Sequence, residues 1–250
     1  MRMKISKNRI ISFLWQHLLL LFSLYLMTLG VALCIRSQLG SSVISSLPLS
    51  LSLDGAAGGM MPDMTVGDYT VVMNFVFVIM QILILRRRFE AVQLFQLVIG
   101  WVFGFLINAN MWVTSFIDCS TLTMQILAQL AGCTVMGIGI AFEVRCGSVT
   151  MPGEGITVAL STVTHIPFPK MKIIVDTSLV LLAIASCYLF FGAWRMDIVG
   201  PGTLFAMVYV GLVVKFINRR ICWFDRLLRY RPGLRRYIYG LARYIYRRND

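Results

Sequence analysis

Ionisable side chains inside apolar sequence are the residues of this chain that are best placed to do chemistry. Asp176 lies within the run Ile173–Leu179, whose other members are uncharged, and Lys172 precedes it by four residues. This spacing places both side chains on one face of a helix. A carboxylate at the centre of a bilayer costs about 2.5–3.5 kcal/mol, so Asp176 is expected to face the protein interior and to have a partner. The pair predicts either a structural ion pair or a site for a proton or a cation.

Two glycine-containing segments at the starts of short apolar stretches are further candidates. In Met151–Gly155, proline suits a first helical turn, Gly153 allows close approach of the backbone, and Glu154 suits the positive end of the helix dipole. Glu154 is therefore either an ordinary first-turn carboxylate or part of an ion or substrate site. At the matching place in the first half, Ser41 and Ser42 either bind an anion with free backbone N–H groups or cap and pack the helix.

Two arginines follow long apolar segments at equivalent positions. Arg36 and Arg145 either extend to the membrane interface or face a central polar cavity as partners of an anion. Asn74 lies inside an apolar segment. Glu143 and His165 are weaker candidates, because each is near a helix end where interfacial solvation accounts for it. The predicted substrate- or ion-binding residues are Arg36, Ser41, Ser42, Asn74, Arg145, Gly153, Glu154, Lys172 and Asp176.

Sequence signatures of enzymes are lacking. The chain has no G-x-S-x-G, H-E-x-x-H, phosphate-binding-loop or dinucleotide-binding motif. Two histidines exclude a histidine-rich metal site, and none of the six cysteines forms a C-x-x-C pair, which favours buried small hydrophobic residues. We therefore expect no catalytic residues, no metal and no cofactor.

The elements that must position these residues are apolar helices. With 58% hydrophobic and 14% charged residues, the chain has too little polar surface for a soluble domain of this size. Two apolar segments, Ser41–Leu53 and Met151–Ile166, fall short of the roughly 20 residues that a bilayer requires. Six segments are long enough to span: 10–35, 67–85, 91–113, 121–144, 171–192 and 198–218.

An internal repeat relates the two halves of the chain. The pattern Leu26-x-x-x-Gly30 through Arg36 matches Val135-x-x-x-Gly139 through Arg145, and Phe105–Asn108 matches Lys215–Asn218 at nearly the same offset. Each half is therefore predicted to contain a long helix, a short helix and two long helices. The predicted divisions are an N-terminal segment (1–9), a first membrane repeat (10–113), a second membrane repeat (121–218) and a basic tail (219–250).

Basic residues predict the topology. They gather before the first apolar segment, at Arg86–Arg88 and in residues 219–250, which contain ten arginines. If both short segments are re-entrant, the chain spans the membrane six times and all three groups face the cytoplasm, as the positive-inside rule requires. Eight spans would place Arg86–Arg88 outside. Three spans per half give the halves opposite orientations, a plan common in transporters. We therefore expect a multi-pass protein of the bacterial cytoplasmic membrane with both termini in the cytoplasm.

The basic tail predicts a lipid partner. Apolar residues form one helical face between Leu234 and Arg248, with arginines opposite, as in amphipathic helices that lie on anionic lipid. The net charge of +12 is concentrated at helix ends, and no nucleic-acid recognition module is present, so nucleic acid is not an expected partner. A homo-oligomer is left open.

Several motifs together resemble one family of membrane proteins. Gly30…Arg36-x-x-Leu39-Gly40-Ser41-Ser42, Ile44–Pro48, Pro152–Gly155, Lys172-x-x-x-Asp176 and Gly200-x-Gly202-Thr203 resemble the YczE/YyaS/YitT group of bacterial integral membrane proteins, over roughly residues 12–220. Val43 stands where that group usually has proline, and Asn108 where its members often have aspartate. The resemblance implies a multi-pass protein of the cytoplasmic membrane and supplies no substrate.

Together these features predict a transporter or permease for a small anionic or zwitterionic solute. The starts of the two short helices would line its cavity, and the carboxylates would couple protons or Na⁺. A competing hypothesis is a non-transporting membrane protein that scaffolds or regulates a partner.

Overall fold

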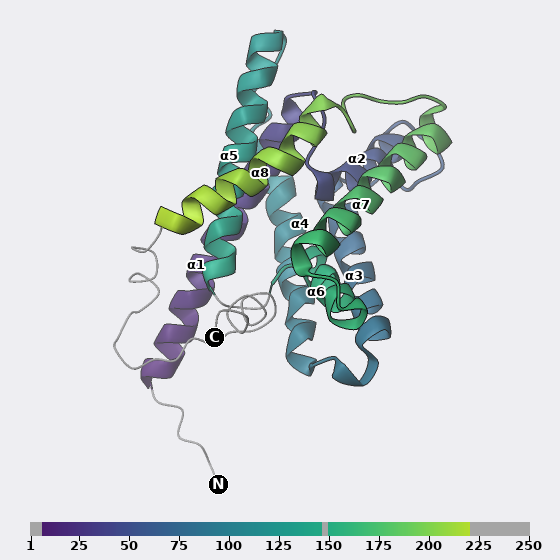
Figure 1. Cartoon of the computed structure of the whole chain (residues 1–250). Helices are drawn as coiled ribbons and strands as arrows, with labels where there is room; N and C mark the ends of the chain where they lie inside the picture. Colours follow the sequence, from purple (N-terminus) through teal and green to yellow (C-terminus); the bar gives the residue numbers. More distant parts are fainter. Residues whose placement is uncertain (1–6, 147–149, 221–250) are drawn as a thin grey trace.

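A computed structural model describes residues 7–146 and 150–220, and within them all regular secondary structure is helical (Figure 1). This confirms the predicted all-α fold. In chain order the elements are α1 (Lys7–Arg36), α2 (Val43–Ala56), α3 (Val66–Leu85), η1 (Arg86–Arg88), η2 (Ala91–Leu94), α4 (Phe95–Val113), α5 (Leu122–Cys146), α6 (Pro152–Thr164), α7 (Phe168–Phe191) and α8 (Pro201–Arg220).

Six of these helices are long and apolar enough to cross a membrane: α1, α3, α4, α5, α7 and α8. Their outer surfaces carry large exposed apolar side chains such as Phe75, Trp101, Phe105, Leu181 and Leu189. Apolar surface of this extent is stable in contact with lipid and not with water. The chain is therefore a polytopic helical membrane protein. The cysteines within the described residues are free and buried, as the sequence predicts.

Helices α2 and α6 are the two short segments, with 14 and 13 residues. Both fall below the length that a bilayer requires. In Figure 1, α2 lies in the upper part of the molecule beside α7, whereas α6 lies lower, beside α3 and the lower end of α7. In sequence, each short helix lies between two long helices.

The short helix of each half packs on a long helix of the other half. Helix α1 packs along α5, α2 packs on α7 while α6 packs on α3, and α4 packs on α1 while α8 packs on α5. The α1–α5 contact is close because glycines line it: a Cβ atom at Gly30 would lie 2.5 Å from the carbonyl oxygen of Gly132. These pairings fit two repeats of opposite orientation.

One pair of helices breaks this symmetry. Helices α3 and α4 pack so closely that a Cβ atom at Gly67 would lie 2.2 Å from the carbonyl oxygen of Gly104. The corresponding helices of the second half, α7 and α8, make no comparable contact. In Figure 1, α8 crosses α5 instead of running beside α7.

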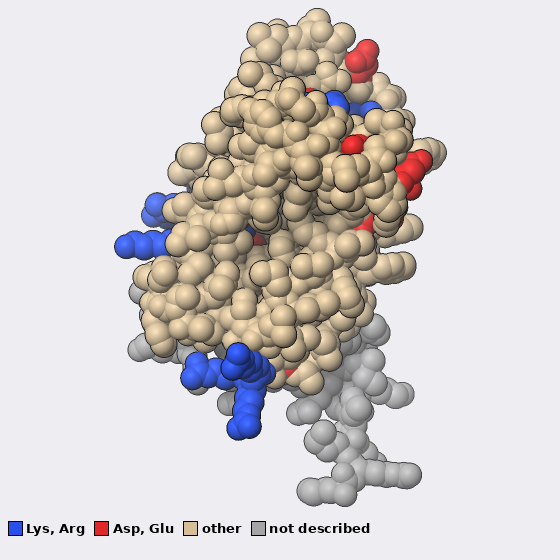
Figure 2. Space-filling model, turned by 90° about the vertical axis from the view of Figure 1, so that its right-hand side faces the viewer, with Lys and Arg blue, Asp and Glu red and all other residues tan. Residues whose placement is uncertain are grey.

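Charged side chains are distributed unevenly over the surface. In Figure 2 a group of basic side chains projects from the lower end, most visible acidic side chains lie towards the upper right, and neutral side chains cover most of the remaining surface. The arginines of η1 are exposed, and Figure 1 places η1 at the same end as the start of α1. The predicted amphipathic tail and the first basic residues, Arg2 and Lys4, lie outside the described residues.

Candidate functional site

The starts of the two short helices meet inside the bundle, beside the middle of α3. A Cβ atom at Gly153, in the first turn of α6, would lie 2.7 Å from Cδ1 of Ile44 in the first turn of α2. The same atom would lie 3.7 Å from the ring of Phe77 on α3. Glycine at this position therefore permits the close approach. Helix N-termini carry free N–H groups and partial positive charge, so this meeting point can attract negatively charged groups.

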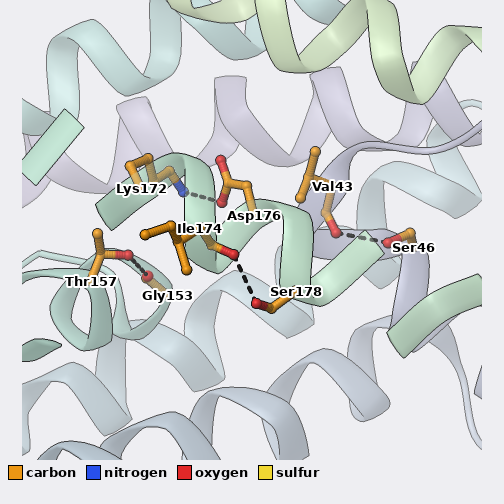
Figure 3. Close-up of polar contacts among 8 residues, drawn as sticks. All are labelled: Val43, Ser46, Gly153, Thr157, Lys172, Ile174, Asp176 and Ser178. Carbon is orange, nitrogen blue, oxygen red and sulfur yellow. Dashed lines mark hydrogen bonds and ion pairs between the residues drawn. The ribbon is translucent and has the colours of Figure 1, made fainter. Parts of the chain in front are cut away.

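The predicted ion pair on α7 forms next to this meeting point. Nζ of Lys172 lies 2.8 Å from Oδ1 of Asp176, and the two side chains are 35% and 19% exposed. Figure 3 shows the pair on α7, with Gly153 and Thr157 of α6 nearby and Val43 of α2 to the other side. Lys172 and Asp176 thus supply opposite charges at the place where the short helices converge.

Glu143 belongs to the site, although its position near a helix end suggested interfacial solvation. That interpretation was wrong, because the side chain is only 3% exposed. The backbone N–H of Met151, just before α6, donates to Oε1 of Glu143 at 3.0 Å. Oε2 of Glu143 and Oε2 of Glu154 are both buried without a hydrogen-bond partner. The two glutamates interact electrostatically, and each also interacts with Lys172. His165, by contrast, is exposed at the end of α6.

A buried glutamine pair supports the first turn of α6. Nε2 of Gln81 on α3 donates to Oε1 of Gln96 on α4 at 2.9 Å and to the carbonyl oxygen of Pro152 at 3.2 Å. Both glutamines are at most 2% exposed, and Gly155 packs directly on them. Sequence analysis did not select these residues. Their signal was an amide side chain inside an apolar segment, the same signal that selected Asn74.

The two candidate arginines bind helix ends. Nη2 of Arg36 donates to the carbonyl oxygen of Met111 at 2.8 Å, in the last turn of α4. Nε of Arg145 donates to Oδ1 of Asn218 at 3.3 Å, and its Nη2 donates to the carbonyl oxygen of the same residue, in the last turn of α8. Each arginine therefore stabilises the C-terminal end of the last helix of its own half, where the helix dipole is negative. These contacts do not bring the guanidinium groups to Glu154.

The remaining predicted residues hold connections and interfaces. The N–H and Oγ of Ser41 both lie 3.1 Å from the carbonyl oxygen of Ile198, in the segment before α8. Oγ of Ser42 lies 2.6 Å from Oγ of Ser45 in the first turn of α2. Nδ2 of Asn74 donates to the carbonyl oxygen of Gly100 at 3.4 Å, between α3 and α4. Of the nine predicted residues, the structure thus gathers four at the centre: Gly153, Glu154, Lys172 and Asp176.

The fold and the gathered charges define a multi-pass helical membrane protein with ionisable groups in its interior. Residues 14–219 match the model of a family of unknown function (DUF6198), and the chain belongs to this family. Comparisons with curated proteins and with solved structures gave no match.

Proposed function

We propose that the protein is a transporter that carries a small solute, zwitterionic or anionic, across the bacterial cytoplasmic membrane. The observation that carries this proposal is the convergence of Glu154, Lys172 and Asp176 with the first turns of α2 and α6. Ionisable side chains inside a membrane protein are costly and commonly mark a substrate or ion path. Short helices that end in the interior are a common construction of transporter binding sites.

A zwitterionic solute fits the site better than a purely anionic one. The helix N-termini and Lys172 can donate hydrogen bonds to a carboxylate of the solute. Glu154 and Asp176 can bind its ammonium group. Arg36 and Arg145 donate to the ends of α4 and α8, so an anion would depend on the N-termini and one lysine.

The orientation and the wider kinship belong to the same proposal. Exposed Arg86–Arg88 and the arginine-rich sequence after α8 support cytoplasmic termini, and the basic tail would lie on anionic lipid. The motifs around Gly40, Gly153 and Gly200 support kinship with the YczE/YyaS/YitT group.

One observation favours a different function. The 2.8 Å ion pair between Lys172 and Asp176 would also stabilise a dry bundle that serves as a scaffold for partner proteins. A scaffold needs the pair only for folding, so charge-neutral variants that fold would retain its function.

Uptake by proteoliposomes tests the proposal. Vesicles containing the full-length protein are loaded with buffer and supplied with labelled amino acids, betaines or small carboxylic acids. We expect uptake of a zwitterion by the unaltered protein, loss of uptake in Glu154→Gln and Asp176→Asn, and no change in the exposed control Asp63→Asn. Folded variants that still take up solute would refute the role of the two carboxylates. A lack of uptake of every solute by the unaltered protein would favour the scaffold.

A further inference from the structure

The end of α5 and the first turn of α6 bring two glutamates together through one backbone residue. The N–H of Met151 donates to Glu143 Oε1 at 3.0 Å, and the carbonyl oxygen of Met151 accepts the N–H of Glu154 at 3.0 Å. Both side chains keep one carboxyl oxygen, Oε2, buried without a partner. Glu143 is only 3% exposed, so water does not solvate its second carboxyl oxygen. Each glutamate therefore has an unused position for a ligand that binds oxygen.

Negative charge exceeds positive charge at this place. Glu143, Glu154 and Asp176 interact with a single ammonium group, that of Lys172, which is already paired with Asp176. The N-terminus of α6 adds a partial positive charge of about half a unit. Like charges that share a water-poor site cannot both remain ionised at low cost. The two glutamates therefore require one further positive charge.

Among the described residues, Lys172 is the one cation that interacts with either glutamate. Helices α3 and α4 present the neutral amides of Gln81 and Gln96, which bond to each other. On α1, the ring of His17 packs edge-on against Phe95 of α4, with centroids 5.7 Å apart. Arg145 of α5 donates to Asn218 on α8.

The ligand that fits two free oxygens is a proton. Hard metal cations such as Ca²⁺ and Mg²⁺ take about six or more oxygen ligands, and the described residues offer two free carboxyl oxygens here. A proton bonds covalently to one carboxylate oxygen and removes one of the two negative charges that share this buried place.

We propose that Glu143 and Glu154 form an acid pair that binds one exchangeable proton inside the membrane. Binding converts one carboxylate to a carboxyl group, and release restores both carboxylates. The role of this proton as the coupling ion of transport rests on the proposed function. Its binding to the pair does not depend on transport.

Infrared spectroscopy of the full-length protein in phosphatidylcholine vesicles tests the pair without any solute. We expect the unaltered protein to show the carbonyl band of a protonated carboxyl group at neutral pH, which disappears on alkaline titration. Glu143→Gln and Glu154→Gln should each move the alkaline loss of the band to lower pH, because the remaining carboxyl group loses one like-charged neighbour, and the double variant should lose the band. The exposed control Glu90→Gln should keep it.

The unaltered protein decides the question even if a variant does not fold. A spectrum without the band at neutral pH, in choline chloride and in sodium chloride alike, overturns the proposal. A band in a protein that takes up no solute supports the acid pair and refutes transport. Uptake without the band supports transport and refutes the acid pair.

Discussion

Replacing a glycine by alanine in the α1–α5 interface should destabilise the protein, whereas the same replacement in open space should stabilise it. In Gly30→Ala, the new Cβ would lie 2.5 Å from the carbonyl oxygen of Gly132 and 2.7 Å from the backbone nitrogen of Met136. Ordinary contacts begin at 3.4 Å, and backbone atoms cannot rotate away, so α1 and α5 must move apart. Overpacking of this kind lowers the free energy of unfolding by about 3 kcal/mol at the upper end of its range. The better helix propensity of alanine raises it by about 1 kcal/mol.

The expected net loss for Gly30→Ala is therefore about 2 kcal/mol, which corresponds to a melting temperature lower by roughly 4–8 °C for a chain of this size. The matched control is Gly211→Ala on α8, where a Cβ atom meets nothing within 4 Å. There only the propensity gain of about 1 kcal/mol applies, so the melting temperature should rise. Thermal unfolding in detergent, followed by tryptophan fluorescence, measures both. A Gly30→Ala protein that melts at or above the unaltered protein would refute the close packing of α1 on α5.

Three further substitutions test other parts of the structure by the same measurement. Gln81→Leu should lower the free energy of unfolding by about 1–3 kcal/mol, because it removes the donor to a buried carbonyl of α6 and leaves Gln96 unpaired. The control Ile82→Leu, at an exposed position, should have little effect. Arg36→Gln should cost about 1.5–3 kcal/mol by removing a charged hydrogen bond to the end of α4, and an unchanged melting temperature would contradict that bond. Asp68→Ala should cost about 1 kcal/mol, because the side chains of Thr65 and Asp68 form a capping box at the start of α3, and Asp63→Ala should not.

Much of the fold is predictable from hydropathy and from the repeat. The segment 10–35 became Lys7–Arg36, and the segment 198–218 became Pro201–Arg220, because the apolar length that a bilayer requires marks such helices clearly. The short helices were predictable for the same reason. The separation of α7 from α8 was not, because apolar periodicity identifies helices without identifying their neighbours.

The candidate site was predictable only in part. Glu154, Lys172 and Asp176 were selected because charge within apolar sequence is unusual. Glu143 was undervalued because its burial depends on the packing of Met151 and the start of α6 against it, which local sequence does not determine. The hydrogen-bond partners of the arginines could not be predicted for a related reason: Arg36 and Arg145 lie at helix ends, and their partners on α4 and α8 are remote in sequence.

The unequal packing of the last two helices in each half has a mechanical consequence. In the first half, the backbones of α3 and α4 touch at Gly67 and Gly104, so these helices can separate only by losing their tightest contact. In the second half, α8 packs mainly on α5 and makes little contact with α7. Displacing α7 relative to α8 therefore breaks fewer contacts than displacing α3 relative to α4. The charged side chains of α7 therefore lie on a helix whose position α8 does little to fix.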